Sequence, residues 1–238
     1  MTPIEYATGL RITGISPPLR LTDFKLIAFD MDSTLINIEC VDEIADVANQ
    51  KAQVAAITLA AMRGDITDYK DSLRRRVALL AGVTVSQLDH IYLCRLRLNP
   101  GAAELVAACR AAGLKTLLVS GGFTHFTDRI RDRLGIDYAR ANVLEFDGDA
   151  LTGRLVDQPW GDICDGAEKR QMLLQTCATL GIHPRQAIAM GDGANDLPMM
   201  GEAGLSVAYC AKPAVRARAQ VSIESGGLDR LLSIVHAD

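Results

Sequence analysis

Polar residues that can carry chemistry follow short apolar runs at three places in the sequence. The first run ends in DMDST at residues 30–34, the second in SGG at 120–122, and the third in GDGAND at 191–196. Lys169 opens a helical pattern that precedes the third run. In an open parallel sheet, the carboxyl ends of the strands meet at one edge, where ligands bind. We therefore expect carboxylates, an ammonium group and a hydroxyl to gather at this edge.

This combination of groups suits phosphoryl transfer. Crowded carboxylates need a cation between them, and oxygen ligands without His or Cys suit Mg²⁺. Ser120 and the Gly121 N–H, together with Lys169, form a cradle for phosphate oxygens. Asp30 and Asp32 lie two positions apart, so one can attack while the other moves a proton. A metal, charge-neutralising donors, a nucleophile and a proton shuttle are the parts that phosphoryl transfer requires.

Each motif taken alone also has a plainer interpretation. The DMDST and GDGAND segments are rich in residues that favour helix N-caps and turns, and SGG is compatible with an ordinary turn between a strand and a helix. Lys169 is compatible with a solvated surface lysine. Because each motif ends an apolar run or opens a helix, their combination favours a catalytic site.

The elements that must position these groups alternate between strand and helix patterns. Short apolar runs bounded by Gly, Ser or Asp indicate buried parallel strands at 24–29, 114–119, 186–190 and 205–210. Helical patterns cover 102–112, 124–134 and 167–180. This alternation predicts a doubly wound α/β fold with a mostly parallel sheet.

Two segments interrupt the alternation. Residues 37–104 are helical in pattern almost throughout, which predicts a helical cap inserted after the first strand, with Asn-Pro-Gly at 99–101 as the return hinge. The catalytic core would then comprise residues 1–36 and 105–238. Within it, residues 143–156 predict a small β-hairpin, because Phe-Asp-Gly-Asp separates two short strand patterns.

The composition is that of a globular protein with one domain, or one domain and an insertion: 238 residues, 49% apolar and 23% charged. A net charge of −4 argues against a nucleic-acid partner. No apolar run is long enough for a membrane span, and the N-terminus lacks the pattern of a signal peptide. Six cysteines without a CxxC pair fit the reducing cytoplasm. We expect a cytoplasmic protein with no nucleic-acid or membrane partner, and leave homo-oligomer formation open.

The motifs resemble those of the haloacid dehalogenase (HAD) superfamily of phosphotransferases. DMDST is similar to its first motif, the segment at Ser120 to its second, Lys169 to its third and GDGAND to its fourth. More closely, the sequence resembles the phosphoserine phosphatases of this superfamily from about residue 24 to about residue 234. The stretches that carry this resemblance are DMDSTLINIE, SLRRRV, VSGGF, MGDGANDLPM and AYCAKP. The resemblance implies a HAD-like Rossmannoid core beneath an inserted cap.

The resemblance also implies roles for the acidic residues. Asp30 would be the nucleophile that forms an aspartyl-phosphate. Asp32 would be the general acid that protonates the departing serine oxygen, and afterwards the base toward water. Asp30, the backbone carbonyl of Asp32, and Asp192 would hold Mg²⁺.

Other core residues would bind the phosphate or hold these groups in place. Ser120, Gly121 and Lys169 correspond to the phosphate-binding groups of the family, and Asn195 would contact the substrate and help to orient the metal site. The supporting residues around them would be Thr34, Gly122 and Asp196.

Cap residues carry the implied choice of substrate. Glu39 and Arg76 match positions that bind the amino group and the carboxylate of the substrate in the family. An amino acid needs one anion and one cation, and Arg can meet a carboxylate with two hydrogen bonds. Glu39 is also compatible with an acid favoured by a helix N-terminus, and the arginines 74–76 with a solvated charged run. Met62 and Tyr69 are candidates for lining the pocket.

The implied function is a Mg²⁺-dependent phosphomonoesterase that converts O-phospho-L-serine to L-serine and phosphate, the last step of serine biosynthesis. One alternative is a phosphatase or phosphotransferase of the same fold that acts on another small phosphoester. Another is a non-catalytic signalling domain that stores phosphate on Asp30, although such a domain needs neither a cap nor a second carboxylate at Asp32. About 22 residues precede the first strand, so we expect no N-terminal regulatory domain.

Overall fold

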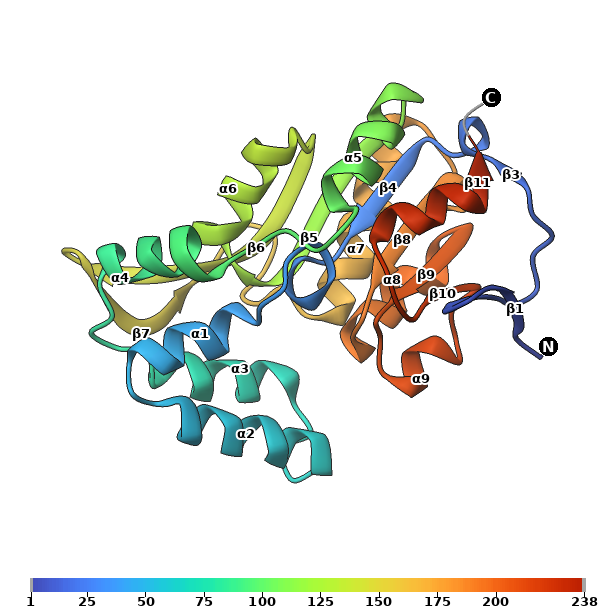
Figure 1. Cartoon of the computed structure of the whole chain (residues 1–238). Helices are drawn as coiled ribbons and strands as arrows, with labels where there is room; N and C mark the ends of the chain where they lie inside the picture. The colour runs from blue at the N-terminus through green and yellow to red at the C-terminus, as the bar shows by residue number, and fades with distance from the viewer. Residues whose placement is uncertain (1, 237–238) are drawn as a thin grey trace.

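The computed structural model describes residues 2–236, apart from the side chain of Met62. Figure 1 shows a central sheet with helices on both faces and a group of helices, α1 to α3, set to one side. Nine strands of the described chain form this sheet in the order β1-β2-β10-β9-β8-β4-β5-β6-β7. The six strands from β10 to β6 in this order run parallel to one another. The outer strands β1, β2 and β7 pair antiparallel with their neighbours. The doubly wound, mostly parallel α/β fold is therefore confirmed.

The strands of this sheet are β1 (Ile4–Ala7), β2 (Leu10–Ile12), β4 (Leu26–Phe29), β5 (Lys115–Phe123), β6 (Tyr138–Asp147), β7 (Ala150–Val156), β8 (Ala187–Gly191), β9 (Leu205–Tyr209) and β10 (Val221–Ile223). Two short strands, β3 (Leu19–Arg20) and β11 (Val235–His236), pair with each other. The α-helices are α1 (Cys40–Val47), α2 (Lys51–Arg63), α3 (Tyr69–Ala78), α4 (Val85–His90), α5 (Ala102–Ala111), α6 (Thr124–Leu134), α7 (Gly166–Leu180), α8 (Leu197–Glu202) and α9 (Pro213–Arg216).

The central strand β4 divides the hydrophobic core between the two faces of the sheet. Its side chains alternate: Ile27 and Phe29 belong to the larger cluster of buried residues, and Leu26 and Ala28 to the other. The first cluster includes side chains of α5 and α6, and the second includes side chains of α7 and α8. Each fully buried Leu, Ile or Phe contributes about 1.5–3 kcal/mol. This packing on both faces fixes the strand that leads into Asp30.

The expected strands and helices of the core lie close to the observed ones. Helix α6 spans the expected residues and ends at Gly135, whose φ of 67° is the left-handed conformation that glycine adopts without strain. Helix α7 begins after Asp165, whose side chain caps it by accepting the Glu168 N–H at 2.9 Å. These boundaries fix where Lys169 lies along α7.

The predicted hairpin differs from the structure in its extent. The strands on either side of Gly148 are present, but the first of them is the second half of the longer strand β6. Its first half pairs parallel with β5, and its second half pairs antiparallel with β7. The hairpin therefore extends the edge of the main sheet.

The segments that enter and leave the predicted cap lie side by side. The Asn37 N–H donates to the carbonyl of Arg97 at 3.1 Å, and the Asn99 N–H donates to the carbonyl of Leu35 at 2.9 Å. The Asn99 side-chain amide also donates to the carbonyl of Ile36, at 3.0 Å. Asn99, expected at the return hinge, thus ties the two crossings together. We keep the division into a core and a cap of residues 37–104 as a proposal.

A second contact joins the cap helices to the hairpin. The Gly82 N–H donates to the Leu151 carbonyl, and the Leu151 N–H donates to the Val83 carbonyl, both at 2.8 Å. The Val85 N–H donates to the Asp149 carbonyl, also at 2.8 Å. The helices α3 and α4 are therefore held at the sheet edge as well as at the hinge.

Among the described residues, no helix has the length and apolar character needed to cross a bilayer.

Candidate active site

The residues that follow β4 place Asp30 at the end of a buried strand. Its side chain is buried, and its Oδ1 atom accepts the Met31 N–H at 2.7 Å. The chain then turns sharply, with Ser33 at a φ of 57°, a conformation that is uncommon for a residue other than glycine. The turn brings the Asp32 carboxylate back toward the pocket, where both aspartates contribute to the lining.

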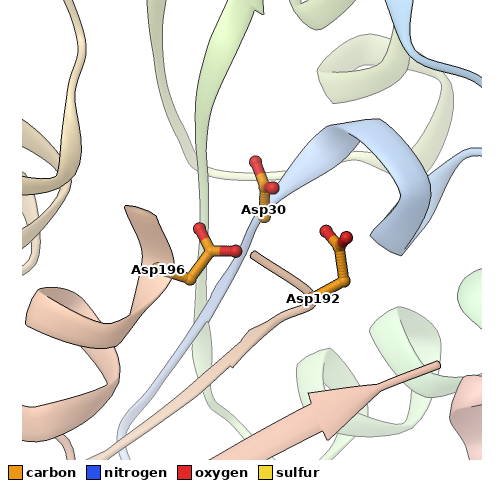
Figure 2. A group of neighbouring side chains, drawn as sticks. All are labelled: Asp30, Asp192 and Asp196. Atoms are coloured by element: carbon orange, nitrogen blue, oxygen red, sulfur yellow. The ribbon is translucent and has the colours of Figure 1, made fainter. Parts of the chain in front are cut away.

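Three carboxylates from separate segments converge beside this turn. Figure 2 shows Asp30 after β4, Asp192 after β8 and Asp196 just before α8, with their carboxylates gathered in one region. One oxygen of each lies within 4.8 Å of the others. Asp192 Oδ1 accepts the Thr34 hydroxyl at 3.3 Å, and Asp196 Oδ2 accepts the Gly193 N–H at 3.0 Å. The strand ends thus gather acidic groups as the sequence predicted.

The Lys169 side chain is fully buried and contacts two of these carboxylates. Its Nζ atom is 2.6 Å from Asp30 Oδ1 and 2.6 Å from Asp196 Oδ1. Burial opposes the charge on this ammonium, but the attraction of Asp196 and Asp30 outweighs it and raises the pKa of Lys169 well above its usual range. Lys169 is therefore a charged group that holds two carboxylates, in contrast to the solvated surface lysine that the sequence also allowed.

The electrostatics of the acidic group fit a bound divalent cation. Burial, and then repulsion by Asp196, raises the pKa of Asp30 well above its usual range. Burial, Asp196 and Glu39 raise the pKa of Asp192 to about 7. One ammonium does not balance this many carboxylates, and carboxylate oxygens are the ligands of hard divalent cations. The Asp196 carboxylate belongs to this group although the sequence analysis gave Asp196 only a supporting role.

Asp32 lies apart from the three clustered carboxylates and has its own partners. The Cys40 N–H donates to Asp32 Oδ2 at 2.9 Å, and the Cys40 thiol donates to Oδ1 at 3.2 Å. Burial, and then repulsion by Glu39, raises the pKa of Asp32 to about 7. The two donors of Cys40 therefore hold the Asp32 carboxyl group in one orientation. The role of Cys40 could not be inferred from its spacing.

The segment of residues 120–122, at the end of β5, forms the opposite wall. Ser120 is fully buried, and its Oγ atom accepts the Gly122 N–H at 2.8 Å. A side chain at Gly121 would clash with the Tyr69 hydroxyl, because a Cβ atom there would lie 2.5 Å from it. A larger residue at this position would require the Tyr69 side chain of α3 to shift. Ser120, Gly121 and Gly122 all contribute to the pocket lining.

The pocket joins this wall to the cap in a cavity of about 510 Å³. Glu39 and Arg76 line it on the cap side, and Asn195 lines it on the core side. Glu39 accepts the Ser33 hydroxyl at 2.6 Å but makes no ion pair within residues 2–236. Arg74 and Arg75 pair with Asp162 and Asp71, whereas the Arg76 guanidinium has no ion pair in the described chain. Glu39 and Arg76 thus face the cavity without an ion-pair partner in the described chain, although Arg76 Nε donates to the Ser72 carbonyl at 3.4 Å.

The residues assigned to the site from the sequence, apart from Met62, are brought together around this cavity. The ones that line it are Asp30, Asp32, Glu39, Arg76, Ser120, Gly121, Gly122, Asp192 and Asn195. Thr34, Lys169 and Asp196 are buried behind the lining. Tyr69 lines the cavity as expected, and the side chain of Met62 lies outside the described part of the structure.

Two charged residues of the lining had not been identified from the sequence. Asp42, in the first turn of α1, lines the cavity, and burial raises its pKa while the nearby Arg76 opposes the rise. Lys212 lies at the rim, where its N–H donates to the Asp192 carbonyl at 3.4 Å. The motif AYCAKP was the available signal for Lys212. For Asp42 the signal was weaker: it lies three residues after Glu39, a spacing that places both side chains on the same face of a helix.

Comparisons with known proteins identify the class to which this fold and site belong. A family model described as haloacid dehalogenase-like hydrolase matches residues 24–204. The fold also superposes on a solved HAD family hydrolase from Salmonella enterica serovar Typhi with a TM-score of 0.84. That protein is 38% identical, and the match covers 92% of this chain and 72% of the other.

Similar proteins with assigned activities narrow this class further. A phosphoserine phosphatase of Albidiferax ferrireducens is 74% identical over 98% of this chain and 99% of its own length. One of a Polaromonas species is 73% identical over 99% and 100%. A solved structure of a substrate-bound phosphoserine phosphatase complex has a TM-score of 0.81 at 36% identity, covering 89% of this chain and 98% of the other. The chain therefore belongs to the phosphoserine phosphatase family of HAD-like hydrolases.

Proposed function

We infer that this chain is an enzyme that hydrolyses O-phospho-L-serine to L-serine and phosphate, the last step of serine biosynthesis. The observation that carries the inference is the shared cavity. Asp30 lies in it beside the segment of residues 120–122, while Glu39 and Arg76 present an anion and a cation that make no ion pair in the described chain. These are the groups that a phosphate ester of an amino acid requires. Full-length relatives named phosphoserine phosphatase support the same reaction.

Asp30 is the nucleophile in the mechanism that we propose. Its Oδ1 atom is held by the Met31 N–H and by Lys169 Nζ, which leaves Oδ2 to attack the phosphorus atom. The new bond from Oδ2 to phosphorus replaces the bond from phosphorus to the serine oxygen, and an aspartyl-phosphate forms. The two donors on Oδ1 also fix the carboxylate orientation, so the attack needs little rearrangement.

Asp32 carries the proton in both half-reactions. In the first, its protonated carboxyl group donates to the departing serine oxygen, which leaves as a neutral hydroxyl. In the second, the resulting carboxylate accepts a proton from the water that attacks the aspartyl-phosphate. Phosphate is then released and Asp30 is regenerated. The pKa of Asp32, raised to about 7 by burial and by Glu39, suits a group that must both donate and accept near neutral pH.

Ser120, Gly121 and Lys169 hold the transferring phosphoryl group. The Ser120 hydroxyl already accepts the Gly122 N–H, so its own proton is free to be donated to a phosphate oxygen. Lys169 Nζ has three N–H donors, and contacts to Asp30 and Asp196 engage two of them. The Ser120 proton and the third N–H of Lys169 are therefore left to donate to phosphate oxygens next to Asp30.

Mg²⁺ is the cofactor that we propose for the acidic group. Asp30, the Asp32 carbonyl and Asp192 would hold the ion, while Asp196 and Thr34 orient Lys169 and Asp192 through their hydrogen bonds. When bound, the ion neutralises charge on the phosphoryl oxygens. Its presence would also remove the repulsion that raises the pKa values of Asp30 and Asp192.

The cap residues bind the amino acid part of the substrate. We assign the substrate carboxylate to Arg76, the arginine of its run without an ion pair in the described chain, and the amino group to Glu39. The Ser33 hydroxyl orients Glu39, and this contact links the cap to the turn that carries Asp32. Asn195 contacts the substrate from the core side of the cavity.

The general-acid role of Asp32 predicts a loss that depends on the leaving group. Asp32→Asn should lower kcat for phosphoserine by about 10²–10⁴-fold, because a serine alkoxide leaves poorly without a proton. An aryl phosphate has an acidic leaving group, so its first step should suffer much less. Rapid mixing would show a burst of aryl alcohol followed by slow turnover. Equal losses in the first step for both substrates would remove Asp32 from this role.

Substrate selection by the cap predicts a different pattern for Arg76 and Glu39. Arg76→Ala should lower kcat/KM for phosphoserine by about 10- to 150-fold, since a hydrogen bond to a charged group contributes about 1.5–3 kcal/mol. The effect should lie mainly in KM, because the contact is the same in the ground state and the transition state. Glu39→Gln should act in the same direction. Steady-state phosphate release measures both variants.

Two controls make this test specific. A small aryl phosphate has neither amino group nor carboxylate, so both variants should hydrolyse it almost as fast as the parent does. Arg75→Ala, which removes a neighbouring arginine paired with Asp71, should leave phosphoserine turnover unchanged. Unchanged phosphoserine kinetics in Arg76→Ala and Glu39→Gln would refute the assignment of the substrate.

The cytoplasm remains the proposed location. All six cysteines lie within the described residues and are free, as expected in a reducing compartment. The substrate is a small phosphorylated amino acid. The absence of a nucleic-acid partner stays a prediction from the sequence, which leaves homo-oligomer formation open.

A further inference from the structure

The segment of residues 120–122 lies in an interruption of the sheet. Strand β5 pairs with β6 at Val119 with Arg140, and pairing resumes at Phe123 with Asn142. Four steps along β5 therefore correspond to two along β6, which is a bulge. Gly121 and Gly122 lie inside the bulge, where the backbone of β6 offers them no regular partner. Their buried polar groups must find other ones.

The side chain of Asn142 supplies those partners. Its Nδ2 atom donates to the Gly121 carbonyl at 2.8 Å and to the Gly122 carbonyl at 3.2 Å. Its Oδ1 atom accepts the Cys164 N–H at 2.8 Å. The residue is 1% exposed and is absent from the pocket lining. Asn142 thus acts on the bulge from behind, without access to the substrate.

These bonds fix one peptide plane at both of its ends. The Gly121 carbonyl is held by Asn142, and the N–H of the same peptide unit, on Gly122, is held by Ser120 Oγ at 2.8 Å. Because a trans peptide is planar, neither end can rotate without the other. The Ser120 hydroxyl consequently stays an acceptor for Gly122, and its proton stays directed away from that bond.

The third bond of Asn142 reaches the helix that carries Lys169. Cys164 immediately precedes Asp165, the N-cap residue of α7, and the Lys169 N–H donates to the Asp165 carbonyl at 2.9 Å. A single buried amide therefore connects residues 120–122 with the first turn of α7. The two sources of phosphate-binding donors are joined through this side chain.

We propose that Asn142 is a positioning residue that sets residues 120–122 in place against Lys169 for phosphate binding. The inference rests on the proposed phosphate-binding role of Ser120, Gly121 and Lys169. Without the Asn142 amide, the peptide unit after Gly121 is held at its Gly122 N–H alone, by Ser120 Oγ. The Ser120 hydroxyl and the Gly121 N–H would then lose their fixed direction toward the phosphate. A misplacement of about 1 Å in such a group lowers the rate by about 10²-fold.

The test is Asn142→Ala, compared with the parent on phosphoserine and on a small aryl phosphate. We expect kcat/KM to fall by about 10–100-fold on both substrates, because both carry the same phosphoryl group. The inhibition constant of inorganic phosphate should rise by about tenfold. The dissociation constant of L-serine, which lacks a phosphate, should stay that of the parent. This separation distinguishes Asn142 from Arg76, whose loss should affect phosphoserine alone.

Two further variants separate positioning from stability. Asn142→Asp keeps the size of the side chain and an acceptor for the Cys164 N–H, but an ionised carboxylate cannot donate to two carbonyls. We expect the same loss of phosphate binding from it. Gln220→Ala removes another amide, one that accepts the Ser206 N–H at 3.0 Å and is absent from the pocket lining. It should lower the thermal unfolding temperature and leave both inhibition by phosphate and turnover unchanged.

Two results would overturn the inference alone. One is a parent-like phosphate inhibition constant and kcat/KM in a folded Asn142→Ala or Asn142→Asp chain. The other is an equal weakening of phosphate and L-serine, which would indicate a general disturbance of the pocket. If the parent releases phosphate from neither substrate, the proposed function itself fails and this inference falls with it.

Discussion

Asp30→Asn is expected to abolish phosphoserine turnover, lowering kcat by at least about 10⁴-fold. The amide is a far weaker nucleophile than the carboxylate and cannot form a stable bond to phosphorus. The fold should remain, because Asn retains an Oδ1 acceptor for the Met31 N–H and for Lys169 Nζ. In the parent, burial and then repulsion by Asp196 and Asp192 raise the pKa of Asp30. A neutral amide at this position removes that repulsion. Steady-state phosphate release measures the loss.

A folding control is needed for this variant. Thermal unfolding of Asp30→Asn should resemble that of the parent, and phosphoserine should still bind, since Glu39 and Arg76 are untouched. Rapid acid quenching of the parent during turnover should trap phosphate on the Asp30 peptide, and the same peptide from the variant should carry none. Near-normal phosphate release by a folded Asp30→Asn chain would eliminate Asp30 as the nucleophile.

Removal of divalent metal should have an effect of comparable size. EDTA is expected to lower phosphate release by at least about 100-fold, because a bound cation contributes several kcal/mol of charge stabilisation. Asp30, Asp192 and Asp196 place oxygen atoms within 4.8 Å of one another, and without a cation they repel. Mg²⁺ should restore the activity. Ca²⁺ should inhibit, because it takes more ligands at longer distances.

Stability provides an independent measure of metal binding. Binding to the folded chain alone raises the free energy of unfolding, so the thermal unfolding temperature should increase with Mg²⁺ concentration. Asp192→Asn should weaken that increase, since it replaces a charged carboxylate ligand by a neutral amide, whose oxygen binds a divalent cation more weakly. Full activity in metal-free buffer, with no shift in unfolding temperature on adding Mg²⁺, would contradict the proposed metal site.

The central strands could be predicted from sequence because they are buried on both faces. All residues of β4, β8 and β9 are buried. In the sequence each strand is therefore a short, mostly apolar run, and a polar residue, glycine or cysteine marks its end. The outer strands gave no such signal. β1 is exposed along its whole length, and its neighbour β2 has three residues. Strands of this kind are specified by pairing with distant segments, and their local pattern carries little information.

Some features of the candidate site could likewise be predicted from the sequence, and others could not. Asp30, Ser120 and Asp192 could be placed together because parallel strands bring their carboxyl ends to one edge. The contacts of Cys40 with Asp32 and of Asn142 with residues 120–122 could not, since each depends on a side-chain hydrogen bond fixed by the folded backbone. The sequence likewise gives no sign of which arginine in a run of three lacks an ion pair.

Phosphate release from a panel of small phosphoesters, with and without Mg²⁺, tests the central claim most directly. The panel should contain phosphoserine, phosphothreonine, phosphoethanolamine, glycerol phosphate and an aryl phosphate. We predict Mg²⁺-dependent release with the highest kcat/KM for phosphoserine, because only the two phospho-amino acids offer both an amino group to Glu39 and a carboxylate to Arg76, and phosphothreonine must also fit an extra methyl group. Equal kcat/KM across the panel, or a preference for an ester without the amino acid group, would contradict the account.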